Sequence, residues 1–276
     1  MQRPPNQLIQ TSHGQIEYAI HGTERVAAVI LSHSTGGGYD QGLVLARLLN
    51  GVQGIAVSRA GYLRTPVTTG PSPAEMADAY ATLLDSLNLE KTAILGLSGG
   101  GMSAAQFALR HPDRCWGLVL ADAITKAPPR SSARIVEKVN SLPDGVAWFL
   151  TRLMVHMGLP LMVHDAETRS MMRVFFENNP ISERRAGVQN DLANVHSMDR
   201  FPWEEIHIPT LLIHGDKDNL IPLEYSQQVA SRIPKAELLI IKGGGHECLV
   251  SRQRETAPRL NMFLAKNKPS SNESAW

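Results

Sequence analysis

The chain has 276 residues, of which 43% are hydrophobic, so it can fill the core of one large α/β domain or of one domain that carries an insertion. Its formal net charge is +1 and it has no run of Lys and Arg, which argues against nucleic acid or an anionic membrane surface as a partner. The chain has two cysteines and no CxxC pair, which predicts reduced thiols. It shows no signal-peptide pattern and no apolar run of about 18 residues, so we expect a cytoplasmic protein without a membrane-spanning helix.

Short apolar runs alternate with helical patterns along the chain, which is typical of a mostly parallel sheet flanked by helices. A polar–apolar alternation over residues 15–20 predicts a half-exposed antiparallel edge hairpin with residues 8–10. Continuous apolar runs predict buried strands at 26–32, 54–58, 92–97, 117–121, 210–214 and 236–241. Helical patterns predict helices at 73–87, 100–110, 223–233 and 252–265. The first of these helices is expected to begin with a capping box formed by Ser72 and Glu75.

Residues 124–205 break the alternation, because they contain no convincing strand, several prolines and a helical texture. We therefore expect a helical cap at 124–205, called the insertion below, on a core formed by residues 1–123 and 206–266, with a frayed tail at 267–276. Met154, Met157, Met162, Met171, Met172 and Met198 all lie in the insertion. Methionine-rich surfaces adapt to irregular apolar ligands, and packing of the insertion against the core is the alternative explanation.

The segment Gly96-Leu97-Ser98-Gly99-Gly100 matches the pattern G-x-S-x-G, which is weak by itself. Its context is more specific, because a predicted buried strand leads into the motif and a predicted helix leaves it. In such a turn the serine backbone is strained, only small residues fit beside it, and the free N–H groups of the helix point at the reacting centre. This pattern predicts Ser98 as a nucleophile.

A serine hydroxyl needs a base, and the base needs a carboxylate that orients it. His246 follows a glycine run after the last predicted strand, so we expect it to act as the base. Asp218 is the expected acid, because it lies in the turn after the strand that ends at His214. Asp216 in the same turn and Asp122 at the end of another strand are the alternatives.

The oxyanion that forms on attack requires hydrogen-bond donors. One donor is expected to be the backbone N–H of Gly99, which follows the nucleophile. The second should come from the loop His33-Ser34-Thr35-Gly36-Gly37-Gly38, where we favour the N–H of Thr35 and then that of Ser34.

Together these residues resemble the α/β-hydrolase superfamily, particularly its capped, carboxylesterase-like members. The resemblance is carried by the segments LSHSTGGGYD, SRAGYLRT, GLSGG, FALRHPDR, HGDKDNLIP and GGGHE, which span almost the whole chain. It implies an eight-stranded, mostly parallel sheet with an antiparallel second strand, a cap after the sixth strand, a catalytic triad at the carboxyl edge of the sheet, and no metal or organic cofactor. The chain departs from the family at the oxyanion loop, where His33-Ser34 replaces the usual His-Gly.

The expected function is hydrolysis of a small-to-medium carboxylic ester or lactone through an acyl-enzyme intermediate, with a small ester-like molecule as the partner. Relatives with the same triad hydrolyse C–C bonds, form peracids or transfer acyl groups, and these alternatives differ in pocket shape and water access. A ligand receptor without catalytic activity on the same fold is a further alternative. Ser98 argues against the dehalogenase-like and epoxide-hydrolase-like relatives, which use an aspartate at this position.

Overall fold

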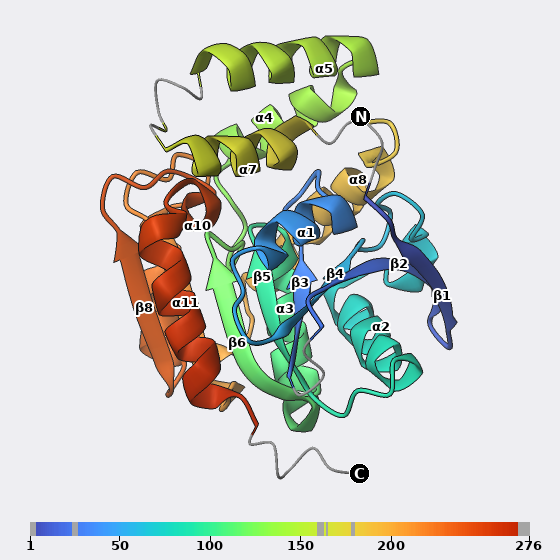
Figure 1. Ribbon diagram of the computed structural model, residues 1–276, viewed down its shortest axis with the longest axis vertical. Helices are drawn as coiled ribbons and strands as arrows, with labels where there is room; N and C mark the ends of the chain where they lie inside the picture. Colours follow the sequence, from blue (N-terminus) through green and yellow to red (C-terminus); the bar gives the residue numbers. More distant parts are fainter. Residues whose placement is uncertain (1–3, 24–26, 159–162, 164, 178–179, 270–276) are drawn as a thin grey trace.

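The structure is a computed structural model that describes residues 4–23, 27–158, 163, 165–177 and 180–269. Its centre is an eight-stranded sheet in the order β1-β2-β4-β3-β5-β6-β7-β8 (Figure 1). β2 is antiparallel to both neighbours, and all other pairs are parallel. The strands are β1 (Gln7–Thr11), β2 (Gly14–His21), β3 (Ala28–Ser32), β4 (Gln53–Val57), β5 (Thr92–Leu97), β6 (Cys115–Ala121), β7 (Thr210–Gly215) and β8 (Ala236–Ile241).

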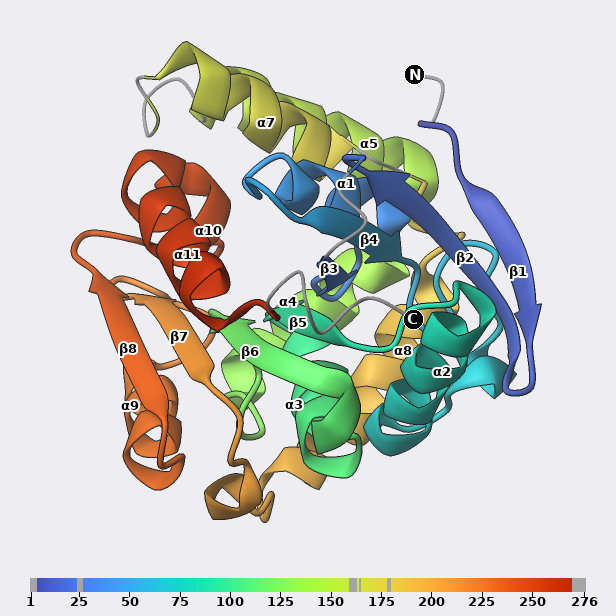
Figure 2. The same cartoon turned by 60° about the horizontal axis from the view of Figure 1, so that its bottom comes forward.

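Helices cover both faces of the sheet (Figure 2). One face packs against α2 (Pro73–Ser86), α3 (Gly100–Arg110) and α9 (Leu223–Arg232), and the other against α1 (Tyr39–Ala46), α10 (Cys248–Ser251) and α11 (Gln253–Asn267). Successive residues of β3 alternate between the two hydrophobic clusters, with Val29 and Leu31 in one and Ile30 in the other. A strand that is buried on both faces needs apolar residues at every position, which explains the continuous apolar runs in the sequence.

The predicted strands and the antiparallel second strand are confirmed, with ends that differ by one or two residues. The capping box of α2 is also present, because the Ser72 side chain accepts from the N–H of Glu75 and the Glu75 side chain accepts from the N–H of Ser72. The expectation that residues 236–241 are fully buried is wrong. β8 is an edge strand in which only Ile241 is buried, and Ile240 is 40% exposed.

The sequence analysis did not predict α1, which is only eight residues long and contains Gly42. A glycine inside a helix lowers its helical propensity. In this fold the glycine is required, because a Cβ atom on Gly42 would lie 2.8 Å from the Cβ of Ala56 in β4. The close approach of α1 to the sheet therefore overrides the local propensity.

The chain between β6 and β7 is helical, and its described part contains no strand. Its elements are α4 (Arg130–Ser141), α5 (Asp144–Leu153), the π-helical turn η3 (Met154–Gly158), α7 (Ala166–Glu177), α8 (Arg185–Asn194), η4 (Val195–Met198) and η5 (Trp203–Glu205). Two short 3₁₀ turns, η1 (Val67–Thr69) and η2 (Pro112–Arg114), lie outside the insertion. The last helix, α11, continues to Asn267, and the end of the expected tail, 270–276, lies outside the described residues.

Among the helices that the structure describes, none is both long enough and apolar enough to cross a membrane. The expected cytoplasmic location stays a prediction. So do the boundaries chosen for the core and the insertion.

Candidate functional site

Ser98 lies in a sharp turn between β5 and α3. Its backbone is in the left-handed region with a φ of 50°, which a residue with a side chain rarely adopts. Two hydrogen bonds hold this conformation, one from the Ser98 N–H to the carbonyl of Ala121 and one from the Ile124 N–H to the carbonyl of Ser98. A Cβ atom on Gly100 would lie 2.1 Å from the carbonyl oxygen of Ser32, so the motif requires glycine at that position. Strain of this kind, held by the surrounding structure, is typical of functional sites.

The structure brings together three residues that lie far apart in the chain. His246 Nε2 lies 3.0 Å from Ser98 Oγ, and His246 Nδ1 lies 2.7 Å from Asp218 Oδ2. The other oxygen of Asp218 accepts hydrogen bonds from the N–H groups of Leu220 and Ile221. Because an ionised carboxylate only accepts, His246 must donate from Nδ1, and its neutral form then presents Nε2 as an acceptor to the hydroxyl of Ser98.

The surroundings of His246 stabilise its charged form. Burial opposes the imidazolium, but the hydrogen bond to Asp218 and the negative charges of Glu247 and Asp122 raise the pKa of His246 to about 9. Burial also opposes the charged form of Asp218, but hydrogen bonds with His214 and His246 hold the pKa of Asp218 well below its usual range. The pair is therefore arranged to accept and hold a proton on the imidazole.

The two alternative acids have other hydrogen-bond partners than His246. Asp216 accepts a hydrogen bond from the N–H of Gly243, 2.6 Å away. Asp122 is fully buried, and its two oxygens accept from the N–H groups of Gly215 and Cys248, at 3.0 and 2.9 Å. Asp122 therefore links the loops that follow β7 and β8, and these loops carry Asp218 and His246.

Asp122, His214 and Asp218 also place possible metal ligand atoms within 4.8 Å of one another. Each of these groups is engaged in hydrogen bonds, however. Both oxygens of Asp122 accept from backbone N–H groups, and Asp218 accepts from His246 and from two N–H groups. The nitrogens of His214 face the Ser226 hydroxyl at 2.8 Å and the Ile221 carbonyl at 3.0 Å. These hydrogen bonds explain why the three side chains lie together: they connect the neighbouring loops.

Gly99 and Thr35 lie side by side next to Ser98. A Cβ atom on Gly99 would lie 3.2 Å from the backbone nitrogen of Thr35. The N–H groups of both residues donate to no described residue, whereas the N–H of Ser34 donates to Gln41 Oε1 at 2.8 Å. The geometry thus leaves Gly99 and Thr35 with free donors and engages the donor of Ser34.

A buried network that the sequence analysis missed holds Thr35 in place. Asp191 of α8 accepts from the Thr35 hydroxyl at 2.7 Å, from the Tyr62 hydroxyl at 2.6 Å, and from both terminal nitrogens of Arg59 at 2.5 and 2.7 Å. Arg59 also donates from Nε to the carbonyl of His33, which begins the loop. Asp191 and Arg59 are separated by 132 residues, and although Arg59 lies in the segment SRAGYLRT, nothing in the sequence indicates that the two residues are in contact.

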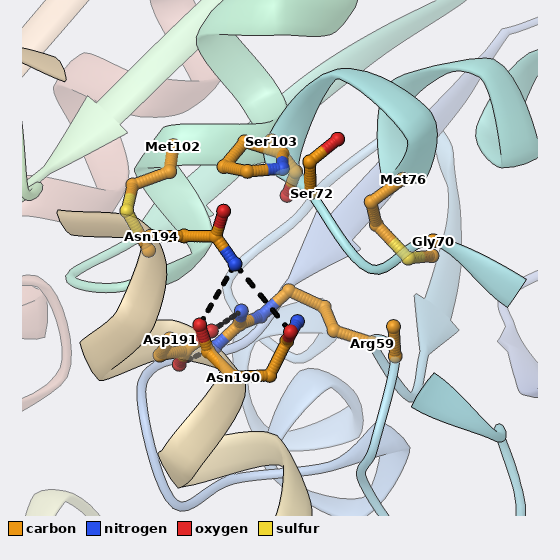
Figure 3. Close-up of a pocket in the computed structure, with 11 residues that line it drawn as sticks. Arg59, Gly70, Ser72, Met76, Met102, Ser103, Asn190, Asp191 and Asn194 are labelled. Atoms are coloured by element: carbon orange, nitrogen blue, oxygen red, sulfur yellow. Dashed lines mark hydrogen bonds and ion pairs between the residues drawn. The ribbon is translucent and has the colours of Figure 1, made fainter. Parts of the chain in front are cut away.

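Figure 3 shows the Arg59–Asp191 pair at the edge of a small pocket, where Asn194 donates to the backbone carbonyl of Asn190. This pocket has a volume of about 20 Å³, which is enough for roughly one water molecule. The pair separates it from the pocket that contains Ser98, since Asp191 is the residue that lines both. The small pocket beside Asn190 and Asn194 cannot be the substrate site, because its volume holds only about one water molecule.

The pocket that contains Ser98 and His246 has a volume of about 50 Å³. Its wall is mostly aliphatic and comes largely from the insertion and from the loop after β7. The aliphatic lining residues are Ile124, Ala133, Val136, Leu192, Val195, Leu220 and Ile221.

Of the two explanations for the methionines of the insertion, the ligand surface finds no support at this pocket, because no described methionine lines it. Met171, Met172 and Met198 are buried in the hydrophobic clusters, whereas Met154 and Met157 are exposed. Met162 lies outside the described residues.

The sequence is similar to a protein family and to individual hydrolases. A family model described as alpha/beta hydrolase fold matches residues 27–252. The 2-hydroxymuconate semialdehyde hydrolase of Pseudomonas putida is 28% identical over 222 residues, which cover 75% of this chain and 74% of the relative. The poly(3-hydroxyalkanoate) depolymerase of Ectopseudomonas oleovorans is 29% identical over 204 residues, which cover 70% of this chain and 68% of the relative.

Solved structures share the same arrangement. An alpha/beta hydrolase fold protein from Nakamurella multipartita superposes with a TM-score of 0.78 at 26% identity, over 94% of this chain and 99% of that chain. A thermophilic esterase from Thermogutta terrifontis superposes with a TM-score of 0.72 over 96% and 100% of the two chains, and at 22% identity this likeness shows the fold alone. Since the family model spans most of the chain and the sheet has the matching topology, the chain belongs to the α/β-hydrolase fold family.

Proposed function

We propose that the protein is a serine hydrolase that cleaves carboxylic esters or lactones with a small acyl group. The observation that carries the proposal is the hydrogen-bonded chain from Ser98 through His246 to Asp218, with contacts of 3.0 and 2.7 Å. An imidazole placed in this way takes the proton of the serine hydroxyl as the oxygen attacks a carbonyl carbon. The buried carboxylate of Asp218 stabilises the imidazolium that forms.

The reaction proceeds in two halves. In the first, Ser98 attacks the carbonyl, the N–H groups of Gly99 and Thr35 stabilise the oxyanion, and His246 protonates the leaving alcohol. In the second, His246 takes a proton from water as the water oxygen attacks the acyl-enzyme, and it then returns the proton to the oxygen of Ser98 as the acyl–oxygen bond breaks and the acid leaves. Each oxyanion donor is expected to contribute about 10²–10³ to the rate.

The size of the pocket supports a small acyl group. A cavity of about 150 Å³ accepts benzene, and the pocket beside Ser98 has about a third of that volume, near 50 Å³. Its aliphatic wall favours an unbranched alkyl chain over a charged one. Acetyl and propionyl esters are therefore the expected substrates among simple alkyl esters.

Covalent labelling tests the mechanism. A fluorophosphonate should modify the protein at Ser98, as shown by mass spectrometry of its peptides, and the S98A variant should not react. The control is Ser103→Ala, since Ser103 lies on the neighbouring helix α3 and its hydroxyl contacts Ser32 and Tyr80 instead of His246. Absence of label on the folded wild type would overturn the proposal and favour a ligand receptor.

Activity assays separate ester hydrolysis from other uses of the same residues. The relative in Pseudomonas putida is named a semialdehyde hydrolase, so a dienoate C–C substrate belongs beside a p-nitrophenyl ester series. A bromide and peroxide assay tests perhydrolysis. The proposal predicts that the acetate and propionate esters have the highest kcat/KM of all substrates in the panel.

A further inference from the structure

A second pocket adjoins the oxyanion loop. It has a volume of about 120 Å³, and Thr35 is the residue that it shares with the pocket containing Ser98. Phe175 and Phe176 of α7 form part of its wall, and their rings pack edge to face. The acyl group and the leaving group of an ester point away from each other at the carbonyl carbon, so an ester with its oxyanion at Thr35 could extend one of them into each pocket. The two pockets thus provide two compartments for the two halves of one ester.

Glu247 is the notable polar group of the second pocket. It directly follows His246 and has a left-handed backbone, with a φ of 68°. Its side chain is buried, since the residue is only 9% exposed. The Ser34 side chain hydrogen-bonds to the carboxyl group, but the Oε2 atom has no partner among the described residues. Buried carboxylate oxygens are rarely left without a donor, so this atom points to a ligand that supplies one.

The charges around the pocket define the chemistry of that ligand. The guanidinium of Arg184 pairs with Asp40 at 2.6 Å, and both side chains are almost completely buried. Arg184 is thus engaged with Asp40, whereas no ion pair joins Glu247 to a described lining residue of the pocket. The faces of the two phenylalanine rings attract cations and repel anions. The pocket is therefore suited to a hydrogen-bond donor or a cation and unsuited to a carboxylate.

We propose that this second pocket binds the leaving alcohol of the ester, and that Glu247 selects alcohols that carry a protonated amine or another strong hydrogen-bond donor. The inference rests on the proposed ester hydrolysis. Burial raises the pKa of Glu247 to about 7, against the opposing effect of His246. An ammonium bound at Oε2 would restore the ionised form, so ligand charge and carboxylate charge support each other.

Three acetate esters of similar size test the proposal. They are 3-(dimethylamino)propyl acetate, which is cationic, 4-methylpentyl acetate, which is its neutral analogue, and 4-acetoxybutanoate, which is anionic. For the wild type, kcat/KM of the cationic ester should exceed that of the neutral ester by about tenfold or more, the effect of one charge-assisted hydrogen bond. The anionic ester should react more slowly than the neutral one.

The ratio of kcat/KM for the cationic and neutral esters is then measured in E247Q. Because both substrates depend equally on His246, the ratio isolates the contact with the leaving group. We expect the ratio to fall towards one in E247Q and to stay at the wild-type value in Glu90→Gln, since Glu90 is exposed on the surface.

The outcomes are distinguishable. If the wild type does not prefer the cationic ester, or if E247Q keeps that preference, the leaving-group assignment is wrong while the proposed ester hydrolysis stands. If none of the three esters is cleaved and Ser98 takes no fluorophosphonate, both proposals are wrong.

Discussion

Replacing Asp191 with asparagine removes the charge at the centre of the network that holds Thr35. The Asp191 carboxylate accepts four hydrogen bonds, two from Arg59 and one each from Tyr62 and Thr35. The side chains of Arg59 and Asp191 are only 6% and 5% exposed, so the variant leaves a buried guanidinium without its counter-ion. Breaking a buried pair in this way costs about 3–5 kcal/mol of unfolding free energy.

Urea denaturation of Asp191→Asn and wild type measures this loss. The control is Asp85→Asn, which removes an Asp–Arg pair with Arg114 at the surface, joined by one hydrogen bond of 2.8 Å, where the Asp85 side chain is 63% exposed. An exposed pair of this kind contributes less than about 1 kcal/mol. The comparison therefore separates burial of the pair from the loss of an aspartate.

The same variant tests the link to catalysis. Without Asp191 the Thr35 hydroxyl loses its acceptor, and the oxyanion loop loses a contact that fixes its backbone. We expect kcat for p-nitrophenyl acetate to fall by about 10²-fold, the lower value for loss of one oxyanion donor. The assay is run well below the urea midpoint of the variant, so that the protein is folded. A loss of stability no larger than that of the control, or an unchanged kcat, would refute the reasoning.

Four further predictions concern the residues around Ser98. Asp218→Asn should lower kcat/KM for an acetate ester by about 10⁴-fold, as loss of the orienting acid does in serine hydrolases, whereas Asp216→Asn should lower it by less than about tenfold. Because only neutral His246 accepts the serine proton, and its pKa is raised from 6.5 to about 9, kcat/KM should still increase above pH 7; a plateau already reached at pH 6.5 would contradict this. The same raised pKa stabilises the fold fully below pH 6.5, and this contribution should disappear as the pH rises through about 9 in urea titrations. Ala133→Leu should fill part of the pocket beside Ser98 and lower kcat/KM for the butyrate ester by about tenfold or more relative to acetate, and an unchanged ratio would place the acyl chain elsewhere.

The sequence predicts the sheet well, because a strand buried on both faces must be apolar throughout and therefore leaves a continuous run. It also predicts the positions of Ser98, Asp218 and His246, since each follows a strand and the carboxyl ends of parallel strands meet at one edge. The choice between Asp218 and Asp122 needed coordinates. Asp218 and Asp122 both follow strands. The structure shows that the two oxygens of Asp122 accept hydrogen bonds from the N–H groups of Gly215 and Cys248.

Other parts of the site have no local sequence signal. The contact between Asp191 and Arg59 depends on how the insertion folds back over the core. Arg59 lies in the segment SRAGYLRT, but that segment does not indicate a partner 132 residues away. Glu247 lies next to His246 in the sequence and could have been considered as a site residue. Its burial and the lack of a partner for its Oε2 atom depend on how α1 and α7 pack beside it, which the sequence does not show. Likewise, Met171, Met172 and Met198 of the insertion pack in the hydrophobic clusters, and no described methionine forms the pocket wall.

The position of Asp191 on α8 has a consequence for exchanging parts between family members. Segments that lie over a conserved reaction centre are attractive units for recombination, because they shape the pocket while the reacting groups stay behind. Here that modularity is incomplete, since α8 also carries the counter-ion of a core arginine and the acceptor for Thr35. A chimera that imports a foreign segment at this place should lose turnover for every substrate alike unless the donor sequence supplies an aspartate at the corresponding turn of its helix.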